Sequence, residues 1–296
     1  MIKRIVLLPA LSILLLALVA GCAAPQVTQQ PAPSPTPAAT QPPQQKSPAA
    51  TSAPPESIGI NPEDITLNDQ GLVDSWQAVL VPATPFDNMH APGPSGLPTH
   101  IQVLFNGVSD PKSREPGGPV IYIIPVDAYR ELWDSHDSQA VSSQIQQIEA
   151  LSSQLPDPKP VRGLPVLPIE ETFGINDFAT QLRPIAGDAA SASHNGFRFI
   201  GRFAMDATPL TNAGLRYIYQ GFSNDGRYLV TFFFPVRTDA LPDDLEAVST
   251  EDMDAFNSDG LGYLADKAAM LDELPATAWE PDLTRLDALI TSLAIK

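Results

Sequence analysis

Alternating apolar side chains between residues 196 and 236 predict three consecutive β-strands. In the first run, one face carries Phe197, Phe199, Phe203 and Met205, and the other carries Arg198, Ile200 and Arg202. A second run covers 215–222, and the turn residues Asn224-Asp225-Gly226 lead into a third run at 228–236. Both faces carry apolar residues, so we expect an antiparallel meander that is covered on both sides.

Other patterns extend this sheet and predict helices beside it. Apolar runs predict further strands at 75–81, 100–105 and 120–124. Apolar residues at spacings of three and four predict helices at 127–133, 138–155 and 283–293, and the stretch 251–274 is expected to be helical only from Leu261 onward. The order β-β-β-α-β-β-β-α-α predicts an α+β fold, in which helices pack on an antiparallel β-sheet.

The C-terminal part of the chain is similar to PsbP-like domains. The similarity rests on the strand with Tyr217-Ile218-Tyr219, the strand at 227–236, and the final helix with Ser292-Leu293. The proline-rich stretches 82–100 and 156–172 depart from that pattern. The resemblance implies an α/β/α sandwich and a role as an accessory subunit of a membrane complex.

The first residues of the chain predict export and lipid attachment. Lys3 and Arg4 precede an apolar stretch that is short for a transmembrane helix. The stretch Leu18-Val19-Ala20-Gly21-Cys22 resembles the lipobox of bacterial lipoproteins, which implies cleavage between Gly21 and Cys22 and lipidation of Cys22. An ordinary secretory signal with a chance cysteine is the alternative. Cys22 is the only cysteine, so we expect no disulfide, thiolate metal site or cysteine nucleophile in the mature chain.

Composition divides the chain into three parts. Residues 1–21 form the predicted signal peptide, and 22–57 form a linker rich in Pro, Gln, Ala, Ser and Thr that is predicted to be disordered. Residues 58–296 are predicted to form a single globular domain. The net charge of −17 opposes binding to nucleic acid or anionic lipid headgroups, and it is compatible with divalent cations, basic peptides or simple solubility.

Short motifs typical of hydrolases and metal sites are incomplete in this sequence. Gly93-Pro94-Ser95-Gly96 is not the G-x-S-x-G motif of a serine nucleophile. The histidines His90, His100, His136 and His194 form no H-E-x-x-H pair. The stretch 134–137 places His136 between carboxylates, but we predict a polar break between two helices there, with Asp137 or Ser138 as the N-cap.

The acidic stretch 241–266 partly matches a calcium-binding EF-hand loop. Asn257, Asp259 and Asp266 fall at ligand positions, whereas Ala255 stands where a carboxylate is expected, and the closing residue is Asp instead of Glu. We predict an acidic loop followed by a helix start, with low-affinity calcium binding as the alternative and no other cofactor.

Arginines on the meander are candidates for ligand binding. If Arg198, Arg202 and Arg216 share one sheet face, their guanidinium groups could bind an anionic ligand. The alternative is that they pair with carboxylates of a covering helix.

These patterns predict a membrane-anchored extracytoplasmic lipoprotein. Its anchor is expected in the cell membrane, or in the outer membrane of a two-membrane bacterium because Ala23 and not Asp follows the cysteine. We expect a non-catalytic binding or assembly module for a protein or cell-envelope partner, and exposed Trp133 or Trp279 would favour such a binder. The alternatives are a hydrolase whose site is scattered along the chain and an accessory subunit of a membrane complex.

Overall fold

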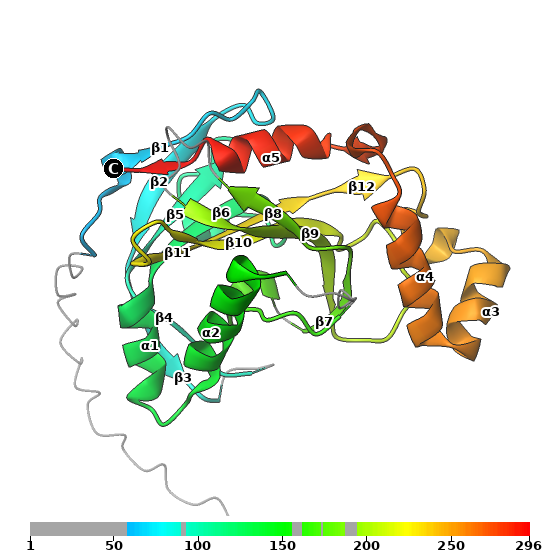
Figure 1. Ribbon diagram of the computed structural model, residues 1–296, viewed down its shortest axis with the longest axis horizontal. Helices are drawn as coiled ribbons and strands as arrows, with labels where there is room; N and C mark the ends of the chain where they lie inside the picture. Colours follow the sequence, from blue (N-terminus) through cyan, green and yellow to red (C-terminus); the bar gives the residue numbers. More distant parts are fainter. Residues whose placement is uncertain (1–57, 90–92, 156–161, 173, 187–193) are drawn as a thin grey trace, which may run out of the picture. The chain divides into compact units, whose positions relative to one another are not determined.

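The computed structural model describes residues 58–89, 93–155, 162–172, 174–186 and 194–296 (Figure 1). The chain separates into two units, Met1–Ser52 and Ala53–Lys296, and the described residues belong to the second. The predicted signal peptide, the cleavage site at Gly21 and Cys22, the linker and His90 lie outside the described residues.

An eight-stranded antiparallel sheet is the centre of the fold. The strand order is β2-β5-β6-β11-β10-β9-β7, and β8 pairs with β9 along the same edge as β7. The strands are β2 (Trp76–Val81), β5 (His100–Phe105), β6 (Val120–Pro125), β7 (Ile175–Ala179), β8 (Arg183–Ala186), β9 (His194–Ala204), β10 (Arg216–Ser223) and β11 (Tyr228–Pro235). The three early strands and the meander are confirmed, whereas β7 and β8 add two strands that the sequence did not predict.

The turn of the meander and its cross-strand side-chain pairs favour the same strand register. Gly226 adopts a φ of 73°, a conformation that glycine tolerates, and its N–H donates to the Ser223 carbonyl at 2.8 Å. This turn sets the register in which Tyr217 faces Phe234 and Tyr219 faces Phe232. Aromatic pairs across strands stabilise this register.

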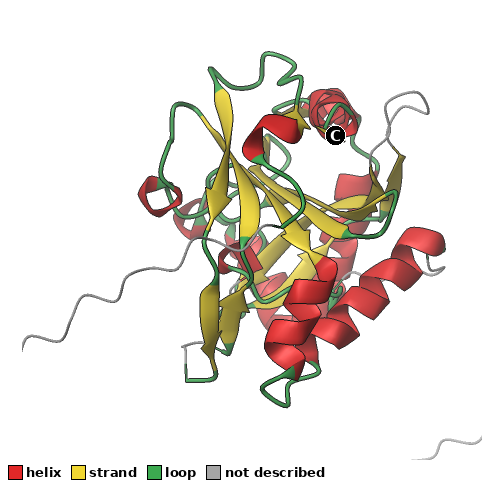
Figure 2. Cartoon of the chain, turned by 90° about the vertical axis from the view of Figure 1, so that its left-hand side faces the viewer, coloured by secondary structure: helices red, strands yellow, loops and turns green. Residues whose placement is uncertain are grey.

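Both faces of the sheet are buried, as the pattern predicted. On one face, Val120, Ile218 and Phe199 pack against helices α1 (Val126–Asp134) and α2 (Ala140–Ser153). On the opposite face, Ile123 and Phe232 pack in a second core with helices α4 (Gly260–Asp272) and α5 (Leu283–Thr291). We call these the α1/α2 face and the α4/α5 face (Figure 1; Figure 2 shows the arrangement turned by 90°). The described chain is therefore an α+β fold with five α-helices around the sheet.

Helix α3 (Thr250–Ser258) shows that the expectation for 251–274 was wrong, since the first half of this stretch is helical as well. The Ser249 hydroxyl caps its first turn by accepting from the Asp252 N–H at 3.1 Å, and acidic residues follow near the positive end of the helix dipole. None of its residues is fully buried, so the helix lacks the apolar stripe that would reveal it. It lies against α4, where Phe256 meets Tyr263 edge-on.

The break between α1 and α2 also differs from expectation. Gln139 occupies the N-cap position of α2, so neither Asp137 nor Ser138 has that role. The Gln139 side chain makes no capping hydrogen bond. Asp137 instead adopts a φ of 58° in the turn. The Asp134 carboxylate stabilises the start of α2 by accepting from the Ser142 hydroxyl at 3.1 Å.

Three small pairs of strands complete the described fold. Strand β1 (Ile65–Thr66) pairs with β14 (Ala294–Ile295), so the two ends of the domain lie side by side (Figure 1). The others are the pair β3 (Thr84–Asp87) with β4 (Ser95–Leu97) and the pair β12 (Arg237–Thr238) with β13 (Trp279–Glu280). No helix within the described ranges has both the length and the apolar character needed to cross a bilayer.

A buried histidine connects the meander to the C-terminal helix. His194 Nε2 lies 2.9 Å from the Ile290 carbonyl, which can only accept, so Nε2 carries the proton. Nδ1 then accepts from the Tyr219 hydroxyl at 2.7 Å. Burial lowers the pKa of His194, and also that of His100, so both imidazoles are expected to be neutral.

This arrangement predicts an acid-sensitive fold. Between pH 7 and 5.5 the unfolded chain takes up protons on both histidines near their ordinary pKa of about 6.5, and the folded chain takes up fewer because burial lowers both pKa values. The free energy of unfolding therefore decreases as the pH falls, by up to about 1.4 kcal/mol per pH unit for each histidine. Urea unfolding at several pH values measures this dependence. The free energy of unfolding should change less steeply with pH in His194→Gln than in the wild type. The control Gln146→Ala, at an exposed residue without an ionisable group, should keep the wild-type pH dependence, and an unchanged dependence in His194→Gln would contradict the assignment.

Candidate functional site

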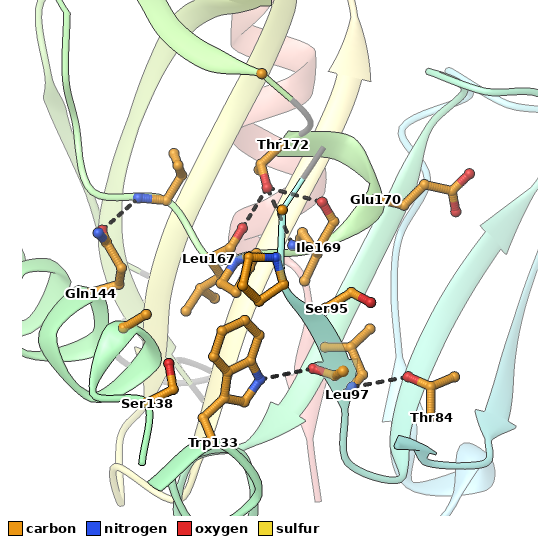
Figure 3. Close-up of a pocket in the computed structure, with 17 residues that line it drawn as sticks. Thr84, Ser95, Leu97, Trp133, Ser138, Gln144, Leu167, Ile169, Glu170 and Thr172 are labelled. Carbon is orange, nitrogen blue, oxygen red and sulfur yellow. Dashed lines mark hydrogen bonds between the residues drawn. The ribbon is translucent and has the colours of Figure 1, made fainter. Parts of the chain in front are cut away.

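The strongest candidate for a binding site is a cavity of about 660 Å³ on the side of α1 and α2 (Figure 3). Its walls come from the β3–β4 pair, the end of α1, the start of α2, the segment 166–172 and Gly174. The lining includes Thr84, Ser95, Leu97, Trp133, Ser138, Ala140, Gln144, Leu167, Ile169, Glu170 and Thr172. Most of this surface is apolar, so the cavity suits an apolar group.

One wall is held in place by Trp133. Its indole N–H donates to the Gly96 carbonyl at 3.0 Å, which ties the end of α1 to β4. Phe86 meets the Trp133 ring edge-on at 5.0 Å. Gly96 has a φ of 145°, and a Cβ there would lie 2.8 Å from the Phe86 Cα, so the close approach requires glycine.

The opposite wall is held by side-chain to backbone hydrogen bonds. The Thr172 hydroxyl lies within hydrogen-bond distance of the carbonyls of Leu167 and Ile169. Gln144 of α2 accepts from the Val166 N–H at 3.0 Å (Figure 3). These contacts leave little freedom in the segment 166–172, so the cavity is preformed.

Few polar groups of the lining are available to a ligand. Ser95 and Ser138 contribute hydroxyls, and Glu170 contributes the one ionisable side chain among the described lining residues. The Glu170 carboxylate is 63% exposed and lies 3.4 Å from Arg114 Nη2. Among the described residues, no hydrogen bond joins Ser95 to a histidine, and His136 bonds to the Leu132 carbonyl and stacks on Phe86.

A buried ionic cluster adjoins the cavity wall without lining it. Arg114 forms an ion pair with Glu171, whose side chain is 1% exposed. Burial raises the pKa of the Glu171 carboxyl, although Arg114 and Tyr122 act in the opposite direction. Burial likewise raises the pKa of Tyr122 and lowers that of Arg216. Sequence reasoning missed Arg114 and Glu171, because 56 intervening residues and an irregular segment separate them.

The three arginines predicted to share a face do not form one site. Arg198 and Arg202 lie on the α4/α5 face, whereas Arg216 pairs with Gly201 and lies on the α1/α2 face. Arg198 donates to Asp287 of α5 through Nε at 3.1 Å and Nη2 at 3.3 Å. Arg202 donates to Asp177 of β7 through Nε at 3.2 Å and Nη2 at 2.5 Å. The alternative, pairing with a covering helix, therefore describes Arg198.

The partial EF-hand match falls on two helices, so the structure forms no continuous calcium loop there. Asn257 lies in the last turn of α3, Asp266 lies within α4, and Asp259 caps α4 by accepting from the Gly262 N–H at 3.0 Å. Across the described ranges, no group of three or more His, Cys, Asp or Glu side chains is placed to hold a metal ion.

The two tryptophans named as possible exposed aromatics are buried. Trp133 is 1% exposed and Trp279 is 5% exposed. Neither provides an aromatic surface for a partner, and Trp133 acts instead as a wall of the cavity.

No protein-family model matches the chain, and no curated protein or solved structure matches it either. The similarities to lipoprotein signals and to PsbP-like domains therefore stay predictions from the residues quoted for them.

The Arg198–Asp287 pair makes a specific prediction for stability. The Asp287 carboxylate also accepts from the Tyr217 hydroxyl at 2.8 Å. Asp287→Ala should leave the buried Arg198 without its partner and lower the free energy of unfolding by about 2–3 kcal/mol, somewhat less than a fully buried pair because Asp287 is 28% exposed. Urea unfolding measures the loss.

The exposed Arg130–Glu149 pair supplies the control for that measurement. Glu149→Ala should change the free energy of unfolding by less than about 0.5 kcal/mol. If both variants lost the same free energy of unfolding, the buried pair would stabilise the fold no more than the exposed pair does.

Proposed function

We propose that this chain is a membrane-anchored extracytoplasmic lipoprotein whose domain binds a ligand without catalysing a reaction. The preformed cavity between the β3–β4 pair, α1, α2 and the segment 166–172 is the observation that supports binding. Its volume lies in the range of small-molecule sites, which is about 300–1,000 Å³. The anchor is proposed from the lipobox-like stretch that ends at Cys22.

The lining indicates the chemistry of the ligand. Apolar side chains such as Leu97, Leu167 and Ile169 would bury an aliphatic or aromatic group, and a few hydroxyls would orient it. The walls are already ordered by the bonds of Trp133, Gln144 and Thr172, so binding would cost little conformational entropy. A small apolar molecule of the cell envelope, or an apolar side chain of a partner protein, fits this description.

Filling the cavity should abolish binding. Ala140 of α2 and Ser95 of β4 lie on different walls, so Ala140→Trp and Ser95→Trp place an indole in the cavity from two sides. The probe is N-phenyl-1-naphthylamine, a neutral fluorophore that brightens in apolar sites. Saturable binding is expected for the wild-type chain, secreted from residue 22 onward with Cys22→Ser, and each variant should weaken it at least about tenfold, a loss of about 1.4 kcal/mol.

Ala150→Trp provides the matched control, because Ala150 is exposed on the same helix and does not line the cavity. This variant should bind the probe like the wild type. Unsaturable binding, or binding that neither blocking variant reduces, would contradict a functional cavity.

The anchor is tested on the full chain. In a bacterial host fed an alkyne-tagged fatty acid, the wild-type protein should incorporate the tag, and Cys22→Ser should lose it because no other cysteine is present. Ala23→Ser should keep the tag. A wild-type chain that takes up no tag, or a Cys22→Ser chain that keeps it, would exclude lipidation at this residue.

A further inference from the structure

A second hollow lies at the sheet edge, separate from the cavity described above. It has a volume of about 730 Å³ and runs between the ends of β7 and β9 on one side and the α3–α4 junction on the other. We call it the edge groove. Its lining includes Ile175, Met205, Asp206, Phe256, Asp259 and Leu261.

Exposed apolar side chains gather around this groove. Ile175 is 72% exposed, Met205 is 68% exposed and Leu261 is 53% exposed. Only two other large apolar residues in the described ranges are comparably exposed, Met89 and Leu245, and neither lines the groove. Contiguous exposed apolar surface of this kind marks interaction sites.

The wall formed by α3 and α4 is strongly acidic. Residues 250–272, which form α3, α4 and the junction between them, contain six Asp or Glu residues and one basic residue, Lys267. Asp206 and Asp259 line the groove itself. Arg162 is the one basic residue among the described lining.

A partner in the groove would contact side chains, because backbone groups at the edge of β7 are already hydrogen-bonded. The Gly163 N–H donates to the Asn176 carbonyl at 3.0 Å, and the Leu164 N–H donates to the Asn176 side chain at 3.1 Å. The outer edge of β7 is therefore occupied at Asn176, so a partner would not extend the sheet there. Recognition would rest on apolar contacts and on charge.

We infer that the edge groove docks a cationic amphipathic segment of a partner protein. Apolar side chains of such a segment would cover Ile175, Met205 and Leu261, and its lysines or arginines would meet the acidic wall. A second copy of this chain would present the same negative charge, and anionic lipid headgroups would also be repelled. The inference does not depend on the cavity between α1 and α2.

The probe for this inference is a fluorescein-labelled peptide of twelve residues built from Leu and Lys in helical amphipathic spacing. Fluorescence anisotropy measures its binding to the secreted chain carrying Cys22→Ser. The double variant Met205→Ser/Leu261→Ser should weaken binding about tenfold, because both side chains would leave a buried contact. Asp206→Asn should weaken it about two- to threefold, with a reduced dependence on salt.

Matched controls exclude a general effect of hydrophobicity or charge. The variant Met89→Ser/Leu245→Ser changes exposed apolar residues that do not line the groove, and Asp74→Asn changes an exposed carboxylate outside the groove and its acidic wall. Both should bind the peptide like the wild type. Thermal unfolding of all variants checks that each is folded, as expected for substitutions at exposed positions.

Three outcomes would overturn the inference. If a peptide in which Glu replaces Lys bound with the same affinity, charge would have no role in recognition. If the groove variant and its control lost the same affinity for the peptide, the groove would not be the binding site. If Met205→Ser/Leu261→Ser instead abolished self-association, or binding to vesicles of phosphatidylglycerol, without affecting the peptide, the groove would serve a second copy or a membrane.

Discussion

Burial of the central sheet on both faces is the constraint on which the rest of the fold depends. Apolar residues alternate so that Ile218 and Phe233 face α1 and α2, while Tyr219 and Phe232 face α4 and α5. A sheet without a polar side must be covered twice, which requires helices before and after the meander. A buried polar side chain within these strands costs free energy unless a neighbouring element supplies a hydrogen-bond partner.

Several buried polar groups have such partners. His194 bonds to the Ile290 carbonyl and Arg198 pairs with Asp287, so two contacts attach α5 to β9. Arg202 pairs with Asp177 and joins β9 to β7. On the opposite face, Arg114 and Glu171 pair across an irregular segment. Such pairs add less stability than apolar packing would, but each is costly to break, so they fix which element lies where.

Regular elements could be predicted because their patterns repeat, and irregular elements could not. The meander, the early strands and the helices α1, α2 and α5 all have a buried stripe or alternating faces. Helix α3 has no buried residue, and two-residue strands such as β1 and β12 are too short for any pattern. The sequence left open whether Arg216 shares a face with Arg198 and Arg202, because that depends on the register between β9 and β10, which pairs Arg216 with Gly201. The cavity escaped prediction because loops from distant parts of the chain form its walls.

The two hollows differ in what they would select, because charge is unevenly distributed over the described domain. In the cavity, Glu170 is the one ionisable group of the described lining and lies beside Arg114, so shape and apolar contact would dominate selection. The edge groove lies against the junction of α3 and α4, and in residues 250–272 acidic residues outnumber basic residues six to one. At physiological ionic strength, exposed charges act over about 8 Å, so only cationic groups next to the docked apolar side chains would gain from this wall. Charge alone would attract many cationic partners, but apolar contact beside it restricts the groove to amphipathic ones.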